Sequence, residues 1–284
     1  MADRLADLEE RIDSIEQLHS VVSAYRGIAA ARLRDAQKRL EGVRSYADTV
    51  GDAIGEALGL MLDGVESAPT EPQEGAHLMI VLCSEQGFVA NFNSRILDEA
   101  ERLIDLDRAA DRVLFIVGDR GLLLARERNL AVDWSVPMAA HADEVTALAN
   151  RLADALYERL EQGRVGRASI LHAAPGQDDV QIVTKSLIPF DFSRFPSVLS
   201  PVAPLTTLPT QELVARLAEE YVFAELYEAA MLSFAAENQT RMLAMVSART
   251  NVKRRLDELT ADARRVRQEE ITAEVTELAA GSLN

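Results

Sequence analysis

The most constraining feature of this chain is the stretch from Thr210 to Ala280, which contains neither glycine nor proline. Apolar and small residues recur along it at steps of mostly three and four, the seam of a coiled coil. Thr210 suits the N-cap, and Gly281 is expected to end the helix. At 1.5 Å per residue, about 70 residues form a helix of roughly 100 Å. We therefore expect this helix to project from any compact domain and to have its seam covered.

A second seam of the same period runs from Asp3 to Asp63 and contains no proline. Its five glycines lower the intrinsic helicity, so a partner helix must supply the missing stability. We predict an N-terminal coiled-coil helix over residues 1–66 that pairs in antiparallel fashion with a C-terminal helix over residues 210–284. Polar seam residues such as Asn238 and Arg249 either fix the register or contact a third protein.

Between the two seams the pattern changes to short apolar runs that alternate with amphipathic ones. A Pro/Glu/Gly linker covers Ser67–Gly75, and a proline-punctuated connector covers Pro189–Pro209. The alternation predicts a Rossmann-like α/β domain over residues 76–190, inserted between the long helices. The predicted strands are His77–Cys83, Arg112–Val117, Ala168–His172 and Val180–Ile188, and the predicted helices are Asn93–Asp105, Gly121–Arg128 and Asp143–Gln162.

Composition excludes several classes of protein. The formal net charge is −16 over 284 residues, which argues against broad nucleic-acid binding because phosphate neutralisation needs clustered Lys and Arg. Cys83 is the single cysteine, so no internal disulfide forms and a reducing compartment is expected. The acidic start is unlike a signal peptide, and no run of about 18 apolar residues exists, so we expect no membrane insertion.

Motifs for catalysis and cofactor binding are missing. The sequence has no GxxxxGK[ST] loop, no GxGxxG after a strand, no GxSxG and no HExxH. Four histidines are scattered without ligand spacing, so neither a metal nor a cofactor is expected. The turn from Gly118 to Gly121 follows a strand and opens a helix; it is either an anion site or, as we favour, a plain connecting turn.

Basic residues cluster on both predicted long helices. The simpler explanation is ion pairing with acids one turn away; the alternative is an electropositive girdle that meets acidic loops of a partner. The clustered residues are Arg32, Arg34, Lys38 and Arg39 on the first helix, and Lys253, Arg254, Arg255, Arg264, Arg265 and Arg267 on the last.

The C-terminal run from Ile271 to Gly281, ITAEVTELAAG, resembles the C-terminal signature of gamma subunits of F-type ATP synthases. Arg267 and Gln268 match the Arg-Gln that precedes this signature in the family. Further upstream, the run from Glu237 to Asn251 is similar to the family pattern SENxxRMxAMxxATxNA. The close sequence resemblance covers the last fifth of the chain. The predicted architecture resembles that of the family over the whole chain.

Elsewhere the resemblance is looser. The run IAAARLR from Ile28 to Arg34 looks like part of the family's first helix, but Ser20, Ser23 and Tyr25 stand where Lys, Lys and Met are usual. The turn SEQGFVANFN at Ser84–Asn93 is similar to the family's SDRGLCGGFN and lacks its arginine. These departures indicate a divergent gamma subunit, such as one from an alternate or sodium-translocating ATPase.

The resemblance implies a non-catalytic central-stalk rotor subunit that couples ion flow to ATP synthesis or hydrolysis. Its implied partners are three alpha and three beta subunits, the epsilon subunit and the membrane c-ring. Its implied place is the cytoplasmic face of a membrane, as a peripheral part of the complex in a bacterial plasma membrane. The expected contacts to the alpha/beta ring are Arg26, Arg267, Gln268, Thr272, Glu274 and Glu277; alternatively, Thr272 and Glu274 only stabilise the terminal helix.

Two other classes of function remain as alternatives. A self-associating coiled-coil scaffold would also need long seams, and it would dimerise on its own. An enzyme built on the α/β insert would need a convergent polar pocket, and the turns after the predicted strands offer only Ser84, Glu85 and Asp119.

Overall fold

The computed structural model describes residues 2–61, 75–106, 111–177, 179–197 and 205–281, so most of the predicted linker at 67–75 lies outside the described residues. The chain divides into two compact units. One consists of Met1–Ala30 and Arg241–Asn284, and the other of Ala31–Thr240. The domain limits predicted from sequence at residues 66, 76, 190 and 210 separate the long helices from the α/β insert, whereas these units group residues by their contacts. The predicted limits therefore stay a prediction.

Two long helices, α1 (Ala2–Met61) and α5 (Thr210–Gly281), begin and end the described chain. They run in opposite directions. Residues further along α1 contact residues nearer the start of α5. In the first unit Glu9 pairs with Arg267, and His19 accepts a hydrogen bond from Arg249. In the second unit Arg44 pairs with Glu228 at 3.0 Å. The predicted antiparallel coiled coil is thus confirmed; Gly281, expected to end the helix, is the last residue inside it.

The seam of α1 follows a strict heptad. Val22, Ala29, Ala36, Val43 and Val50 are all buried at intervals of seven, the repeat that keeps one helical stripe facing a partner. Alanine at two of these positions lets the backbones approach closely. The hydrophobic burial of this stripe stabilises a helix whose glycines would otherwise weaken it.

A five-stranded sheet forms the centre of the second unit, in the order β3-β2-β1-β4-β5. The first four strands in this order are parallel, and β5 pairs in antiparallel fashion with β4. The sequence predicted four strands and missed β3, whose three residues are too few to show a periodic pattern. The strands are β1 (Ala76–Leu82), β2 (Arg112–Val117), β3 (Trp134–Val136), β4 (Val165–Ala174) and β5 (Gln181–Ile188).

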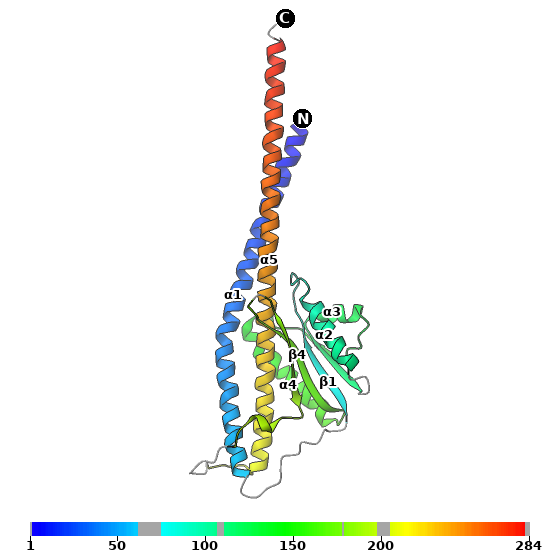
Figure 1. Cartoon of the computed structure of the whole chain (residues 1–284), viewed down its shortest axis with the longest axis vertical. Helices are drawn as coiled ribbons and strands as arrows, with labels where there is room; N and C mark the ends of the chain where they lie inside the picture. Colours follow the sequence, from blue (N-terminus) through cyan, green and yellow to red (C-terminus); the bar gives the residue numbers. More distant parts are fainter. Residues whose placement is uncertain (1, 62–74, 107–110, 178, 198–204, 282–284) are drawn as a thin grey trace. The chain divides into compact units, whose positions relative to one another are not determined.

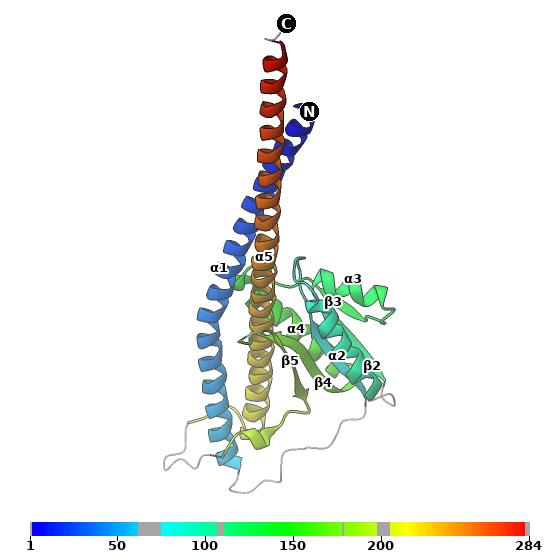
Figure 2. The same ribbon diagram turned by 45° about the horizontal axis from the view of Figure 1, so that its top comes forward.

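Helices cover both faces of this sheet, as Figures 1 and 2 show. Leu78, Ile80 and Leu82 of β1 pack in one cluster with residues of α4, α1 and α5, whereas Met79 and Val81 pack in a second cluster with residues of α2 and α3. The strand is buried on both sides, which explains its unbroken apolar sequence. The short helices are α2 (Phe92–Leu106), α3 (Asp119–Glu127) and α4 (Val145–Glu161), with 3-10 turns at Ala142–Glu144 and Phe192–Arg194.

The start of the connector after β5 is fastened to α5 by charge and by aromatic rings. Glu225 of α5 is 3% exposed and forms ion pairs with Lys185 and Arg194 at 3.0 and 2.8 Å. Phe195 meets Tyr221 of α5 edge to face, with ring centroids 4.8 Å apart. A buried carboxylate needs such partners, because an unpaired one is costly.

The close packing of α3 on β1 yields a stability prediction. A Cβ on Gly121 would lie 2.0 Å from the Cβ of Cys83, so Gly121→Ala should lower the free energy of unfolding by about 1–3 kcal/mol or more. A Cβ on Gly42 of α1 would meet nothing within 4 Å, and Gly42→Ala should stabilise by about 0.5–1 kcal/mol. Urea denaturation of the full chain measures both, and equal effects would contradict this packing.

A buried histidine on β4 yields a prediction on pH. His172 is 3% exposed, and burial lowers its pKa below the ordinary value of 6.5. The unfolded chain therefore takes up a proton before the folded chain does, so the free energy of unfolding should fall as the pH drops below about 6.5. His172→Gln should show a shallower fall in urea midpoint between pH 7.5 and 5.5. Parallel pH profiles would refute this role, since the carboxylates titrate in both proteins.

Candidate functional site

The residues predicted to contact a partner ring all belong to the first unit. Arg26 lies on α1, and Arg267, Gln268, Thr272 and Glu274 lie on α5; the side chains of these five are exposed. The backbone of Glu277 belongs to α5, and its side chain is outside the described residues. The helices thus present these side chains to solvent, and their contact with a ring stays a prediction.

Arg267 has a contact within the chain. Its Nη2 lies 2.5 Å from Oε1 of Glu9, and the two side chains are 60% and 51% exposed. An ion pair this exposed contributes little to stability, about 0–1 kcal/mol. The pair holds the guanidinium beside α1 and leaves most of its surface accessible.

Thr272 and Gln268 are linked along one helix face. The hydroxyl of Thr272 donates to the carbonyl of Gln268 at 2.8 Å, and that of Thr276 donates to the carbonyl of Thr272 at 2.7 Å. Such bonds to the preceding turn satisfy the hydroxyl locally. This geometry fits the helix-internal alternative for the Thr272 hydroxyl, whereas no comparable contact is found for Glu274 among the described residues.

Sequence reasoning missed an apolar stripe at the end of α5. Ile271, Val275 and Leu278 are 55%, 60% and 74% exposed, and steps of four and three place them on one face. Because Glu9 pairs with Arg267 in an antiparallel register, α1 begins close to the level of Glu274 and offers little to cover this stripe. The sequence did show apolar residues at steps of three and four that continue to Leu278 of α5.

A second apolar stripe accompanies Arg26 on α1. Steps of three and four again place its members on one face, centred roughly 70° around the helix from the buried seam residues Val22 and Ala29. An exposed apolar row of this kind marks an interaction surface. The stripe consists of Leu18, Val21, Tyr25 and Ile28, which are 45%, 51%, 43% and 50% exposed.

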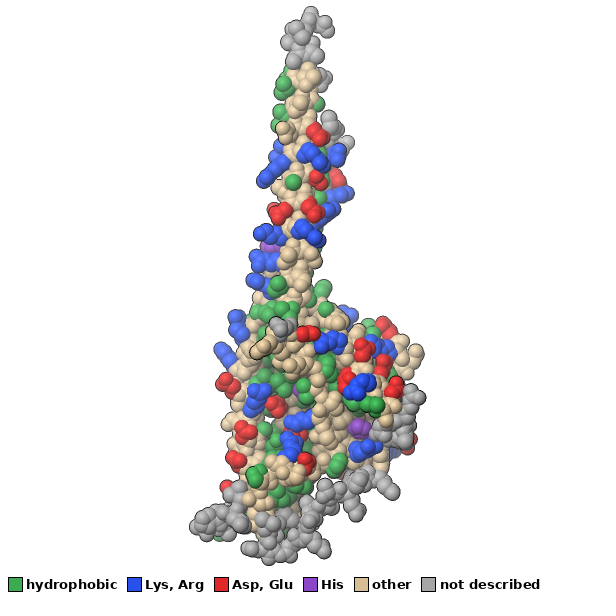
Figure 3. Space-filling view, in the orientation of Figure 1, with side chains coloured by type: hydrophobic (Ala, Val, Ile, Leu, Met, Phe, Trp, Pro, Cys, Tyr) green, Lys and Arg blue, Asp and Glu red, His purple; other side chains and the backbone are tan. Residues whose placement is uncertain are grey.

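The segment of α5 from Arg241 to Arg267, here called the basic belt, carries eight Lys and Arg against three Asp and Glu, a formal charge of +5 in a chain of −16. Figure 3 shows Lys and Arg side chains along the long helices, and of the belt residues Arg241 is buried. Both explanations offered from sequence find support. Arg255 and Arg265 pair with acids three residues away. Lys253, Arg254 and Arg264 form no ion pair with any described carboxylate, and the structure exposes them.

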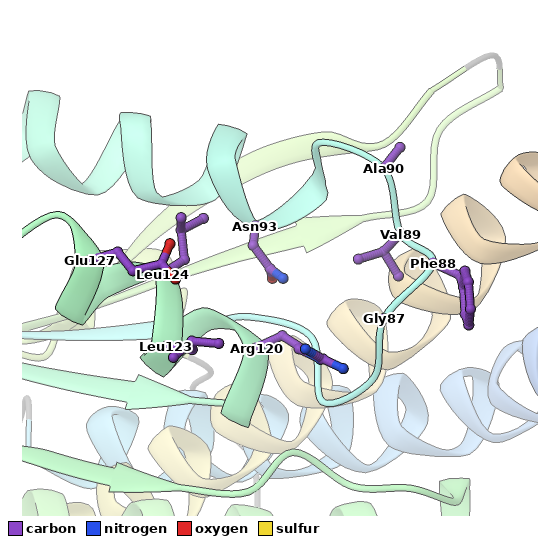
Figure 4. Close-up of a pocket in the computed structure, with 9 residues that line it drawn as sticks. All are labelled: Gly87, Phe88, Val89, Ala90, Asn93, Arg120, Leu123, Leu124 and Glu127. Atoms are coloured by element: carbon purple, nitrogen blue, oxygen red, sulfur yellow. The ribbon is translucent and has the colours of Figure 1, made fainter.

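A hollow of ≈ 470 Å³ lies beside the loop after β1, and its lining residues are drawn in Figure 4. Arg120 and Glu127 of α3 are its charged residues. The amide of Asn93 is already bonded to Ser84, donating to its hydroxyl at 2.8 Å and accepting from its backbone N–H at 2.9 Å. The remaining lining residues are Gly87, Phe88, Val89, Ala90, Leu123 and Leu124.

The turn from Gly118 to Gly121 has an internal partner. The N–H of Asp119, the first residue of α3, donates to the carboxylate of Glu85 at 3.2 Å, as expected of a connecting turn. Among the described residues, no group of three or more His, Cys, Asp and Glu is placed to hold a metal ion. None of the described helices has an apolar stretch of the length and hydropathy needed to cross a bilayer.

A similar arrangement of an α/β layer and long antiparallel helices is found in chains of solved ATP synthase structures. The fold matches a chain of the mitochondrial ATP synthase of Euglena gracilis with a TM-score of 0.64 and 14% identity, over 99% of this chain and 94% of that one. It also matches a chain in the central stalk and c-ring structure of the Tetrahymena thermophila enzyme, with a TM-score of 0.56 and 19% identity, over 80% and 99% of the two chains.

The sequence comparisons agree with the fold. A family model described as ATP synthase matches residues 4–283. The ATP synthase gamma chain of Paracoccus denitrificans is 30% identical over 294 residues, and that of Solibacter usitatus is 27% identical over 286, each covering 98% of both chains. The chain therefore belongs to the ATP synthase family, as one of its gamma chains. Nothing in these comparisons supports the self-associating scaffold.

Proposed function

We propose that this chain is the non-catalytic rotor of a membrane-associated ATP synthase, and that its first unit turns inside a ring of three alpha and three beta subunits. The observation that carries the proposal is the surface of that unit. Two apolar stripes and the basic belt, apart from the buried Arg241, are exposed on a coiled coil whose own seam is buried at Val22 and Ala29. Full-length similarity to gamma chains supports the same role.

The rotor acts by differential contact. The surface of α1 and α5 differs around its circumference, because at the level of Tyr25 the exposed apolar stripe occupies only one face of α1. Each ring site therefore meets a different face and is biased toward a different conformation. Rotation and nucleotide occupancy become coupled, since each contact shifts the population of states at one site. The catalytic chemistry resides in the ring subunits.

The contacts proposed for this chain combine charge with directed hydrogen bonds. Arg26 and Arg267 present guanidinium groups that suit carboxylates and backbone carbonyls of the ring, and Gln268 adds an amide. Thr272, Glu274 and Glu277 extend the contact toward the end of α5. The basic belt attracts acidic partner loops at a distance and so orients the encounter.

The second unit, with the α/β domain, is proposed to carry the epsilon subunit and the c-ring. Two structural neighbours support this, because they come from assemblies described as a central stalk with its c-ring and as a rotor. The complex would lie at the cytoplasmic face of a bacterial plasma membrane, where proton or sodium flow turns the c-ring.

The rotor proposal is tested by tagging the N-terminal side of the full chain and isolating its complexes. We expect an alpha/beta hexamer with ATPase activity, and a several-fold loss of that activity in Thr272→Ala with Glu274→Ala. Thr49→Ala is the matched control for the threonine, because its hydroxyl makes the same bond to the preceding turn, at 2.8 Å to Ser45, outside the proposed contact surface. A homodimer without ATPase subunits would refute the rotor.

The basic belt is tested by charge reversal. Arg254→Glu with Arg264→Glu should slow assembly with the ring several-fold at low salt and flatten its salt dependence, because these exposed cations steer the encounter. Arg126→Glu with Arg151→Glu, at exposed positions on α3 and α4, is the control for the same charge change outside the belt. Stopped-flow assembly at several ionic strengths measures both. Equal effects of belt and control would leave only net charge as the cause.

A further inference from the structure

The strand order creates a place where α/β domains of this kind bind ligands. The chain proceeds from β1 to β2 and β3 on one side, and then crosses to β4 on the other side. The carboxyl ends of β1 and β4 therefore flank a topological switch point, where doubly wound sheets hold phosphate-bearing ligands. The loop after β1 supplies the backbone N–H groups for the phosphate in such sites.

Here α5 occupies that place. Ser233 lies with its hydroxyl 3.5 Å from the carbonyl of Leu82 at the end of β1. Gln239 donates its amide to the carbonyl of Gly176, just past the end of β4, at 2.8 Å. Ala236, between them on the helix, is fully buried in the cluster that contains Val81 and Leu171. The helix thus contacts the exits of both strands that flank the switch point.

The central contact is made by a carboxylate. Glu237 is 4% exposed, and its two oxygens accept from the backbone N–H groups of Glu85 and Gln86, each at 3.4 Å. Two successive amides of the loop after β1 thus converge on one anionic group. A buried carboxylate is costly unless donors of this kind compensate it.

A second carboxylate continues the arrangement across the sheet. Oε2 of Glu85 accepts from the N–H of Asp119 at the start of α3, at 3.2 Å, and from that of Met138, shortly after β3, at 2.8 Å. Glu237 therefore holds the backbone of Glu85, and the side chain of Glu85 holds the exits of β2 and β3. Two glutamates in series satisfy amides at the carboxyl edge where an external anion would bind.

We propose that the loop after β1 is an oxyanion-binding cradle whose permanent occupant is the carboxylate of Glu237. The cradle takes a carboxylate or a phosphate, and the chain supplies the carboxylate itself. Occupation from within fastens α5 to the sheet and closes the switch point to nucleotides. The inference rests on the fold of the second unit and is independent of the rotor role.

The test uses amide hydrogen exchange in the purified full chain, read residue by residue. Glu237→Gln keeps the size of the side chain and removes its charge, and it should speed exchange of the Glu85 and Gln86 amides by roughly tenfold or more. Glu85→Gln should instead speed exchange at Asp119 and Met138. Glu212→Gln, at an exposed position in the first turn of α5, is the matched control and should change none of these amides.

Chemical rescue identifies the cradle. In Glu237→Ala, inorganic phosphate should restore protection at Glu85 and Gln86, whereas chloride at equal ionic strength should not. Labelling of Cys83, the single thiol, gives a second readout, because it is fully buried directly before this loop. Its labelling rate should rise in Glu237→Ala and fall again with phosphate.

Three results would overturn the proposal: unchanged exchange at Glu85 and Gln86 in Glu237→Gln, exchange raised equally throughout the sheet, or rescue by chloride as effective as rescue by phosphate. If Glu237→Ala does not fold, the isosteric Glu237→Gln decides the question by its exchange pattern.

Discussion

The structure depends first on the burial of one heptad stripe between α1 and α5. An isolated helix with glycines at positions such as Gly27, Gly42 and Gly51 would be marginal in water. Pairing removes the apolar stripe from water and stabilises the glycine-containing α1 against α5. The outward faces are not needed for helix pairing, so they can carry the exposed apolar stripes and the basic belt.

The C-terminal helix has a second task in the α/β domain. Leu226 and Phe234 of α5 pack in the same cluster as the sheet and α4, while Glu225 anchors the connector and Glu237 meets the loop after β1. One helix is therefore both a coiled-coil partner and a wall of the α/β core. A change of register in the seam would misplace these carboxylates, so the polar contacts and the heptad specify the same arrangement.

The sequence predicted the features that repeat locally. The heptads, the buried strands such as β1 and the family signature near Gly281 could all be read from spacing within a few turns. β3 was missed because three residues hold no period. The roles of Glu85 and Glu237 could not be predicted, since the two residues are 152 positions apart and only the folded sheet brings them together. Val275 and Leu278 are exposed beyond the level at which α1 begins, and the register that sets this level cannot be predicted from local spacing.

The charge of this chain is unevenly distributed. The basic belt carries +5, and the remaining residues therefore carry −21 of the total of −16. Positive charge is thus concentrated in one segment of α5, while the rest of the chain is acidic. At physiological salt, charge is felt over about 8 Å, so an acidic surface that approaches the belt is attracted while one that approaches elsewhere is repelled. Within α5, an acidic partner surface is therefore drawn to the belt rather than to the segment after Arg267, which carries Glu269, Glu270, Glu274 and Glu277.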